Sequence, residues 1–487
     1  MSNATVANTL AISLTGRQPS RTLWARVARL SDSFVWAALL LIAVLVAIPY
    51  GTVEPWWLAV FECCVFALTA LVVVQKSFAP QQSLSPSRRG FGLLVPVLLV
   101  PLYAFVQSAT ALSADAFETR LWAVKLLAYV FFGALLFSYT STERRLRALI
   151  YTVIGIGVAS AIFGLLRQGL QHDAGFLLPY LQTGFGYAQF INKNHFAFLL
   201  EMSLGLLVGL VLGGGVRRQF WPVAAAAVVL MWTALVMTAS RGAVFTALVQ
   251  IGFAAAIVCA IRLKKYPEEQ AAGIEFRNSA SRLPPTRSII GRVLLIAAIV
   301  GIVGVSAVWL GGDLLTTRMK ALPGEVSTPD AEQHAGVRRQ EVWRSTVALI
   351  KAHPIAGSGL GAYAVAITPF HDGSGKWTPE AAHNDYLELA ASGGLIAVAL
   401  ALWFALSLAR RAKQQLRRRA PFARAAGIGA LTGLFGVAMH SAVDFGLHVT
   451  INTVVFIALV VIATREFQGA TSEGPREGAP LAFAVEV

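Results

Sequence analysis

The segment 382–387, Ala-His-Asn-Asp-Tyr-Leu, places an imidazole, an amide and a carboxylate where a long polar stretch runs into an apolar one. His383 stands at the expected N-terminus of a helix, whose partial positive charge disfavours an imidazolium. A neutral imidazole accepts a proton from a hydroxyl group, so His383 is a candidate general base. Asn384 suits the cap of that helix and Asp385 its first turn. The alternative interpretation is a capped helix end with ordinary interfacial polar residues.

Arg241 is a candidate phosphate ligand. It lies in the run Thr-Ala-Ser-Arg-Gly-Ala (238–243), which separates two long apolar segments with almost no loop, so we expect it at a membrane surface. A guanidinium there can hold a phosphate through two parallel hydrogen bonds. The alternative is an interfacial arginine whose charged head reaches water while its stem lies along lipid.

Polar residues also gather in the Asn-Lys-Asn-His run 192–195, which leads into the apolar segment 195–213. Glu201 lies about two helical turns beyond Asn194 and on the same face. An acid at that depth in a membrane is either functional or hydrogen-bonded to another helix. Lys125, in an earlier apolar segment, is a candidate partner for it.

His440, Asp444 and His448 follow one another at intervals of four residues. On one continuous helix they would share a face and resemble a metal site. Gly446 lies among them, however, and the chain has to reverse between two apolar segments here. We therefore favour a polar cluster that lines an outward-facing cavity, and we predict no metal ion.

The composition is that of a membrane protein. Of the 487 residues, 56% are hydrophobic and 13% are charged. Twelve apolar segments approach the ~20 residues that cross a bilayer, and in lipid they must be helices because backbone groups have to bond internally. These segments are 33–50, 56–75, 91–108, 120–138, 147–166, 195–213, 221–239, 242–262, 289–311, 385–408, 424–441 and 448–464.

The basic residues alternate from one side of these segments to the other. Lysine and arginine accumulate in cytoplasmic loops, so the alternation predicts that both termini are cytoplasmic. The net charge of +15 then reflects loops close to anionic membrane lipid rather than nucleic-acid binding. The basic positions are Arg17, Arg21, Arg26, Arg29, Lys76, Arg88, Arg89, Arg144, Arg145, Arg147, Arg217, Arg218, Arg262, Lys264, Lys265 and the run 410–419.

These segments predict an all-α, polytopic chain in five parts. A cytoplasmic N-terminal segment, 1–32, precedes nine transmembrane helices in 33–311. A periplasmic loop, 312–384, separates them from the last three transmembrane helices in 385–466. A disordered cytoplasmic tail, 467–487, is expected from its richness in Gly, Glu and Ala.

The loop 312–384 is longer than ordinary connections, and such loops are usually functional or disordered. Within it, Trp343, Val347 and Ile350 recur at i, i+4 and i+7, which predicts an amphipathic helix over 337–350. The glycine-rich run 357–361 is expected to form a flexible turn. A loop of this kind would cover the outer face of the bundle.

Several of these motifs together resemble the O-antigen ligase and polymerase superfamily of bacterial envelope glycosyltransferases. They keep the family's order and topology over about residues 190–395, whereas the first 190 residues match only as a hydrophobic pattern. The matching pieces are Asn-Lys-Asn-His-Phe-Ala (192–197), Ser-Arg-Gly (240–242), Arg339 four residues before Trp343, Pro354, the glycine-rich run 357–361 with Tyr363, His-Asn-Asp-Tyr-Leu (383–387) and Gly-Gly-Leu (393–395).

The resemblance implies a GT-C-like fold and a donor glycan carried on undecaprenyl pyrophosphate, transferred at the periplasmic leaflet without nucleotide sugar, cofactor or metal. By motif position, His383 corresponds to the family's essential histidine. Arg241 and Arg339 correspond to arginines that hold the pyrophosphate. Lys193 and His195 are further substrate-binding candidates, together with Asn384 and Asp385.

The motifs do not distinguish between two kinds of acceptor. A ligase transfers the glycan to a lipid A–core sugar, and a polymerase transfers it to another lipid-linked repeat unit, as in lipopolysaccharide or exopolysaccharide biosynthesis. A transporter of the lipid-linked glycan is the alternative class. Transporters more often show internal repeats and broken helices, and the sequence indicates neither.

Overall fold

The protein is a bundle of long helices. The computed structural model describes residues 19–78, 88–170, 187–271, 301, 339–371, 379–417 and 420–465. In these residues nine helices are long and apolar enough to cross a membrane, and two shorter apolar helices accompany them. The predicted all-α membrane protein is confirmed in this part of the chain. The expected segment 289–311 falls almost entirely outside the described residues.

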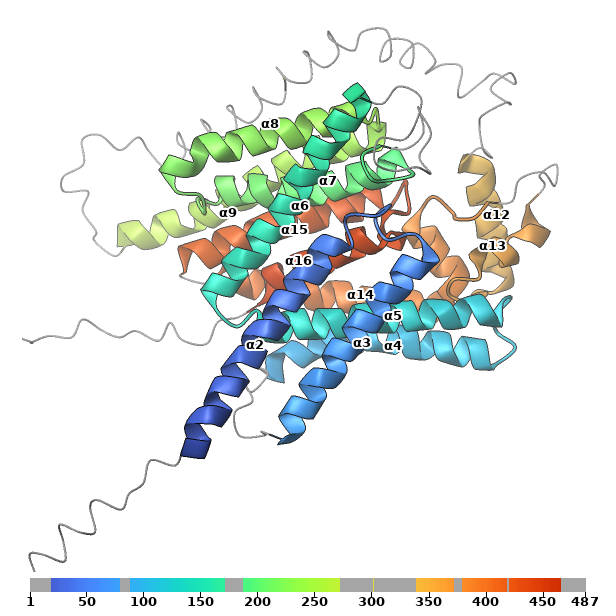
Figure 1. Cartoon of the computed structure of the whole chain (residues 1–487). Helices are drawn as coiled ribbons and strands as arrows, with labels where there is room; N and C mark the ends of the chain where they lie inside the picture. The colour runs from blue at the N-terminus through green and yellow to red at the C-terminus, as the bar shows by residue number, and fades with distance from the viewer. Residues whose placement is uncertain are drawn as a thin grey trace, which may run out of the picture.

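The long helices pack side by side, and the short elements α12 and α13 lie together at one end of the bundle, the α12 end (Figure 1). The elements are α2 (Pro19–Leu45), α3 (Pro55–Phe78), α4 (Arg88–Ala109), α5 (Ala116–Tyr139), α6 (Glu143–Leu170), α7 (Lys193–Leu212), η2 (Arg218–Phe220), α8 (Trp221–Met237), α9 (Arg241–Ala271), α12 (Arg339–Ala352), α13 (Tyr363–Ala366), η4 (Thr368–Phe370), α14 (Asp385–Leu416), α15 (Pro421–His440), η5 (Gly446–His448) and α16 (Thr450–Thr464).

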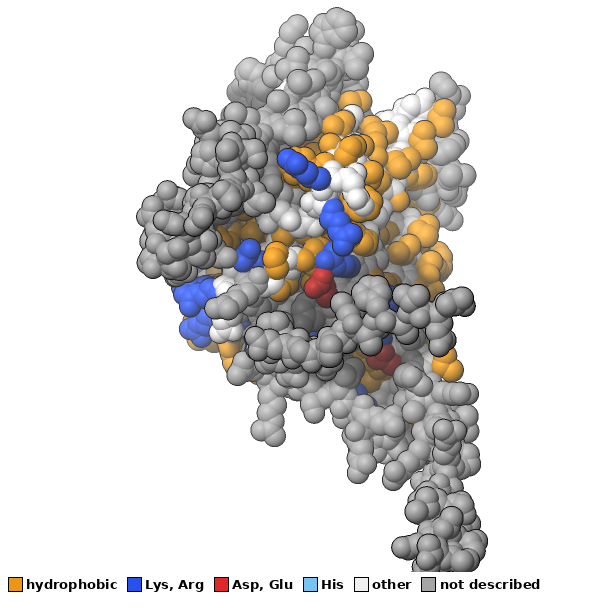
Figure 2. All heavy atoms as spheres, turned by 90° about the vertical axis from the view of Figure 1, so that its left-hand side faces the viewer, with side chains coloured by type: hydrophobic (Ala, Val, Ile, Leu, Met, Phe, Trp, Pro, Cys, Tyr) orange, Lys and Arg blue, Asp and Glu red, His pale blue; other side chains and the backbone are white. Residues whose placement is uncertain are grey.

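Connections from distant parts of the sequence meet at the α12 end. The Ala114 N–H donates to Ser358 O at 2.8 Å, and the Asp385 N–H donates to Ser441 O at 2.9 Å. The opposite end is different in charge: Figure 2 shows Lys and Arg side chains there and few acidic ones among the described residues. Arg217 and Arg218, just before α8, are exposed. Basic side chains therefore gather at the end of the bundle opposite α12.

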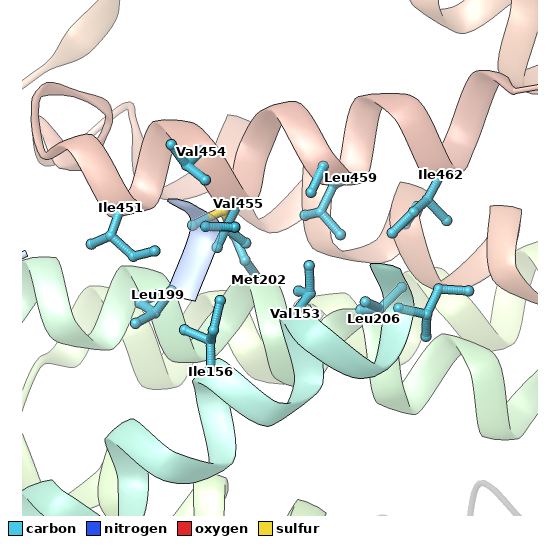
Figure 3. Packing of buried hydrophobic residues seen from close by; sticks show 14 of the residues in the cluster. Val153, Ile156, Leu199, Met202, Leu206, Ile451, Val454, Val455, Leu459 and Ile462 are labelled. Atoms are coloured by element: carbon cyan, nitrogen blue, oxygen red, sulfur yellow. The ribbon is translucent and has the colours of Figure 1, made fainter. Parts of the chain in front are cut away.

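Helix α7 forms the centre of the bundle. In its apolar membrane-spanning stretch, 94% of the residues are buried inside the protein. Its apolar side chains pack against α6 on one side and α16 on another, as Leu199 and Met202 show opposite Val153 and Val455 (Figure 3). A helix that is apolar all round is expected at such a central position.

Glycines let α7 and α15 approach closely. A Cβ on Gly209 would lie 2.6 Å from Gly429 Cα, and one on Gly205 would lie 2.9 Å from the Gly433 nitrogen. Small residues four apart are typical of tightly packed helix pairs in membranes, where close backbone contact replaces the hydrophobic effect. The two helices whose outer ends carry His195 and His440 are held together in this way.

The amphipathic helix in the loop is confirmed as α12, but the predicted buried stripe is wrong by about one position. Val342, Ser345, Thr346 and Leu349 are buried, whereas Val347 is 41% exposed. The helix packs against other residues of the same loop and against the start of α14. This inner face includes the polar residues Ser345 and Thr346. Thr346 is accommodated there because its Oγ1 bonds to the Tyr363 hydroxyl at 2.6 Å.

The glycine-rich run is a packed segment and not the flexible turn that the sequence predicts. Residues 357–360 are all buried. A Cβ on Gly357 would lie 2.3 Å from Ser392 O, and one on Gly361 would lie 2.0 Å from Trp122 Cδ1. Both glycines have positive φ angles, +68° and +86°. The run therefore requires glycine because backbone and indole occupy the space of any side chain.

Helix α14 is broken at Gly394, whose φ of 62° and ψ of −164° are not helical. The sequence did not indicate this break. The backbone groups that the break frees bond to the packed segment: Leu395 N–H donates to Pro354 O at 2.9 Å, and Gly359 N–H donates to Ser392 O at 2.9 Å. The buried Gln107 side chain also donates to Ser392 O, at 3.0 Å. A helix break is tolerated inside a membrane protein when its backbone groups are hydrogen-bonded in this way.

Candidate active site

His383 lies in the turn that enters α14. Its backbone φ is +50°, a left-handed value that is uncommon for a residue other than glycine. The next residue, Asn384, caps α14 because its side-chain oxygen accepts the N–H groups of Tyr386 and Leu387, both at 3.0 Å. The Asn384 amide also donates to Ala442 O at 2.8 Å. Asn384 therefore has a structural role that fixes this turn against the end of α15.

Asp444 lies at the centre of the polar groups at the α12 end. Its carboxylate is 2% exposed and faces three basic side chains that come from different parts of the chain. His195 Nε2 lies 3.8 Å from Oδ1, His383 Nδ1 lies 3.9 Å from Oδ1, and Arg339 Nη2 lies 3.8 Å from Oδ2. The structure thus brings three of the predicted site residues to one acid, which the sequence did not single out as their partner.

The distances around Asp444 are too long for direct hydrogen bonds. Among the described residues, His195 Nε2, His383 Nδ1 and Asp444 Oδ2 are buried and have no hydrogen-bond partner. Buried polar atoms are normally satisfied, and exceptions often mark a place that a water molecule or a ligand fills. The cluster has the character of a site that is open for a polar ligand.

The carboxyl group of Asp444 is held in its charged form. Burial alone would raise its pKa, but the facing rings of His383 and His195 and the Phe445 N–H, which donates to Oδ1 at 2.9 Å, hold the pKa at about 2. His383, in contrast, is 37% exposed. Since its Nδ1 faces Asp444, the opposite edge of the ring, with Nε2, is left for a substrate.

The ring of Phe445 separates three histidines. Its centroid lies 4.7 Å from the ring of His195, 4.8 Å from His383 and 5.5 Å from His448, each in an edge-to-face arrangement. Phe445 therefore contacts the two histidines that face Asp444 and also His448, which belongs to a second polar group at this end. It also lowers the local polarity, which strengthens charge interactions within the site.

The second polar group surrounds His448. Its Nε2 lies 3.3 Å from Glu388 Oε1 and 3.7 Å from Asp385 Oδ1. Burial, with a contribution from the nearby Lys125, lowers the pKa of His448 to about 3, so the ring is neutral near pH 7. Asp385 therefore faces His448 and not His383, although it stands only two residues from His383.

Glu201 pairs with His440. The His440 Nδ1 and Glu201 Oε1 atoms are 2.9 Å apart, and both side chains are 1% exposed. The proposed pairing of Glu201 with Lys125 is therefore wrong, because the Lys125 ammonium instead donates to His448 O at 2.9 Å. A hydrogen bond to another helix was the second interpretation of Glu201, and the structure shows this contact with α15.

His440, Asp444 and His448 do not form one face. His440 ends α15, Asp444 lies in the following turn and His448 closes η5, and each of the three side chains faces a different set of partners. Among the described residues, no three His, Cys, Asp or Glu side chains are placed to share a metal ion. The four-residue spacing does not reflect a shared helical face, because the chain reverses direction between α15 and α16.

Arg241 and Lys193 stand at helix N-termini at the α12 end. Arg241 is exposed at the first residue of α9, and the next residue, Gly242, packs against His440. A Cβ on Gly242 would lie 3.4 Å from His440 Nε2. Lys193 is partly buried at the first residue of α7, two residues before His195.

Residues 226–403 match the family model described as O-antigen ligase. Over this stretch the chain is similar to the O-antigen ligase and polymerase superfamily. No curated protein is matched by the chain. The resemblance that the sequence motifs indicate is therefore confirmed over the stretch that contains Arg241, Arg339 and His383.

The candidate site extends beyond the matched stretch. His195 comes from α7, before it, and Asp444 and His448 come from the turn between α15 and α16, after it. One signal in the sequence pointed to Asp444: an acid between two apolar segments at the outer end of a helix. The identity of its partners depends on how α7, α12 and α15 pack.

Proposed function

We propose that this protein is a glycosyltransferase that moves a glycan from undecaprenyl pyrophosphate to an acceptor sugar at the periplasmic face of the inner membrane. The observation that carries the proposal is the arrangement of His383 and Arg339 on opposite oxygens of the buried Asp444. A general base and a phosphate-binding cation then share one site. The match to the O-antigen ligase family supports the choice of reaction class.

In the proposed reaction, His383 Nε2 accepts the proton of the acceptor hydroxyl as its oxygen attacks the anomeric carbon. The bond between that carbon and the pyrophosphate oxygen breaks, and undecaprenyl pyrophosphate leaves. Attack opposite the leaving group inverts the anomeric centre. General-base help of this kind is typically worth roughly 10²–10⁴-fold in rate.

The arginines act on the leaving group. Negative charge grows on the pyrophosphate as the glycosidic bond breaks, and fixed cations at that position stabilise the transition state. Arg339 is 47% exposed at the outer end of the site, and Arg241 stands at the start of α9 at the same end of the bundle. Lys193 and His195 are further candidates for contacts with the donor.

Asp444 has a role in this scheme that the sequence did not reveal. Proton transfer turns His383 into an imidazolium, and a charged carboxylate 3.9 Å from Nδ1 stabilises it. The same carboxylate attracts Arg339 and so orients both groups. Asp444 itself keeps its charge, because its pKa is about 2.

The proposed orientation places the α12 end in the periplasm. The opposite end carries the Lys and Arg side chains seen in Figure 2, as cytoplasmic loops do. The donor lipid would then lie in the outer leaflet with its pyrophosphate at the level of the helix N-termini that carry Arg241 and Lys193. Ligase and polymerase differ only in the acceptor, and both fit this arrangement.

The break in α14 is the one observation that favours a transporter, since transporters often bind substrate at broken helices. Here, however, the freed backbone groups bond to the segment 354–359 and to Gln107. They support packing at this point, which favours the enzyme.

Purified protein and a radiolabelled lipid-linked glycan separate these functions. The proposal expects glycan transfer with release of undecaprenyl pyrophosphate when the right acceptor is present. Lipid A–core and an unlabelled lipid-linked repeat unit are supplied in separate reactions, which distinguishes a ligase from a polymerase. Movement of intact donor across a proteoliposome membrane, without cleavage by either acceptor, would contradict the proposal and support a transporter.

A further inference from the structure

The residue before His383 is held by two side chains. The Ala382 N–H donates to Glu388 Oε2 at 2.8 Å, and Ala382 O accepts from the Trp343 indole N–H at 3.0 Å. Ala382 is fully buried. Side chains from α14 and α12 therefore bind both backbone groups of one residue, although neither helix contains it.

This arrangement bears on the backbone of His383. Its φ of +50° costs free energy for a residue with a side chain, and such conformations persist only where the surroundings enforce them. On its other side, Asn384 and Asp385 are tied to Ala442 O and Ser441 O by hydrogen bonds of 2.8 Å and 2.9 Å. Hydrogen bonds therefore hold the residues on both sides of His383, and these bonds fix the direction of its side chain.

Trp343 also relates His383 to Arg339. The two residues Arg339 and Trp343 are one helical turn apart on α12, so they move together with that helix. Arg339 faces Asp444 Oδ2, while Trp343 bonds to the residue before His383. Helix α12 therefore carries one side chain that faces Asp444 and another that holds the backbone next to His383.

Glu388 connects the same turn to the second polar group. Its Oε2 accepts from Ala382, while its Oε1 faces His448 Nε2 at 3.3 Å. Its side chain is 10% exposed. An intramembrane acid that faces a neutral histidine and accepts a backbone N–H is suited to holding a turn in place.

We propose that Trp343 and Glu388 are positioning residues that fix the His383 imidazole against Asp444 by binding the two backbone groups of Ala382. This inference rests on the proposed role of His383 as general base. It predicts that the two residues affect catalysis through His383 and not through the affinity for the donor. Without the two hydrogen bonds to Ala382, His383 stays in the site but its imidazole is misoriented.

The test uses Trp343→Phe, Glu388→Ala and Glu388→Gln in the full-length protein, each alone and combined with His383→Ala. Trp343→Phe keeps an aromatic side chain but removes the indole N–H donor together with the five-membered part of the ring. Tyr103→Phe is the matched control, because it removes one side-chain donor from another backbone carbonyl, Ala356 O at 2.7 Å. Transfer is measured with labelled lipid-linked glycan, and donor-site affinity with undecaprenyl pyrophosphate as the probe.

We expect Trp343→Phe and Glu388→Ala to lower kcat about 10- to 100-fold, the range for small misplacements of a catalytic group. Affinity for undecaprenyl pyrophosphate and the melting temperature in detergent should stay near wild type. Glu388→Gln should recover much of the activity, since its amide oxygen still accepts the Ala382 N–H. Neither change should lower the residual transfer of His383→Ala any further.

Two outcomes would overturn the inference. One is wild-type kcat in both Trp343→Phe and Glu388→Ala. The other is a loss in the His383→Ala background as large as in the wild-type background, which would show that the residues act independently of His383. Equal loss in Glu388→Gln and Glu388→Ala would point to proton transfer by Glu388 itself. Failure of the proposed function is distinct, because His383→Ala alone would then transfer glycan normally.

Discussion

His383 Nδ1 and Asp444 Oδ1 lie 3.9 Å apart, although one residue precedes α14 and the other follows α15. Their approach depends on the hydrogen bonds that tie the start of α14 to the turn 441–444, including Asp385 N–H to Ser441 O at 2.9 Å. The pair gives the candidate base a charged partner that is 2% exposed.

His383→Ala should reduce transfer by roughly 10²–10⁴-fold, the usual contribution of a general base. Donor binding should stay largely intact because it rests on the arginines and the lipid. His353→Ala, an exposed histidine just after α12, is the matched control and should keep wild-type turnover. Turnover near wild type in purified His383→Ala would remove the assignment, and lost donor binding in folded protein would move His383 to the pyrophosphate site.

Arg241→Lys and Arg339→Lys should each lower kcat/KM about 10- to 100-fold, from roughly 1.5–3 kcal/mol per hydrogen bond to a charged group. Lysine keeps the charge but loses the planar fork that matches a phosphate. The exposed Arg344→Lys on α12 serves as control and should have little effect. Full activity in both Arg241→Ala and Arg339→Ala would exclude the proposed contact with pyrophosphate.

Asp444 should stabilise the folded protein through its charge, and melting temperatures in detergent measured against pH provide the test. Its pKa is depressed, so its ionisation stabilises the fold above the unfolded value of roughly 3.9 and this stabilisation is lost only as the pH falls through about 2.

Asp444→Asn should lower kcat, because the imidazolium that forms on His383 during proton transfer loses its anionic partner 3.9 Å away. Turnover of the purified variant, alone and combined with His383→Ala, provides the measurement. A loss in the His383→Ala background as large as in the wild-type background would show that Asp444 acts on another group.

The orientation in the membrane can be tested with two cysteines on described, exposed positions, introduced after replacement of Cys63, Cys64 and Cys259 by alanine. Lys351→Cys at the end of α12 should react with an impermeant thiol reagent in intact spheroplasts. Lys413→Cys, near the other end of α14, should react only after lysis. The reverse pattern would place the candidate site on the cytoplasmic side.

Gly394→Ala should destabilise the bundle by about 1–3 kcal/mol or more, as overpacking does. The new Cβ would lie 2.2 Å from Ile355 O, at a residue with a φ of +62°. Gly252→Ala in α9 is the control, because a Cβ there meets nothing within 4 Å. Melting temperatures in detergent give the comparison, and equal stability of the two variants would mean that the break tolerates a side chain.

The sequence by itself determined the class of the protein. Hydropathy predicts the described membrane helices because a backbone in lipid has to satisfy its own hydrogen bonds. The motifs around Arg241, Arg339 and His383 indicated the superfamily, which the match over residues 226–403 confirms. The helix α12 was also predictable, since a soluble amphipathic pattern has a recognisable period.

The tertiary structure decided which polar groups meet. In a membrane, the side of a helix that faces lipid and the side that faces protein are both apolar, so periodicity does not show which helices are neighbours. Glu201 therefore meets His440 rather than Lys125, and Asp444 joins His195, Arg339 and His383. These partnerships arise from glycine-mediated packing of α7 on α15 and from the turns at the α12 end, which only the folded chain brings together.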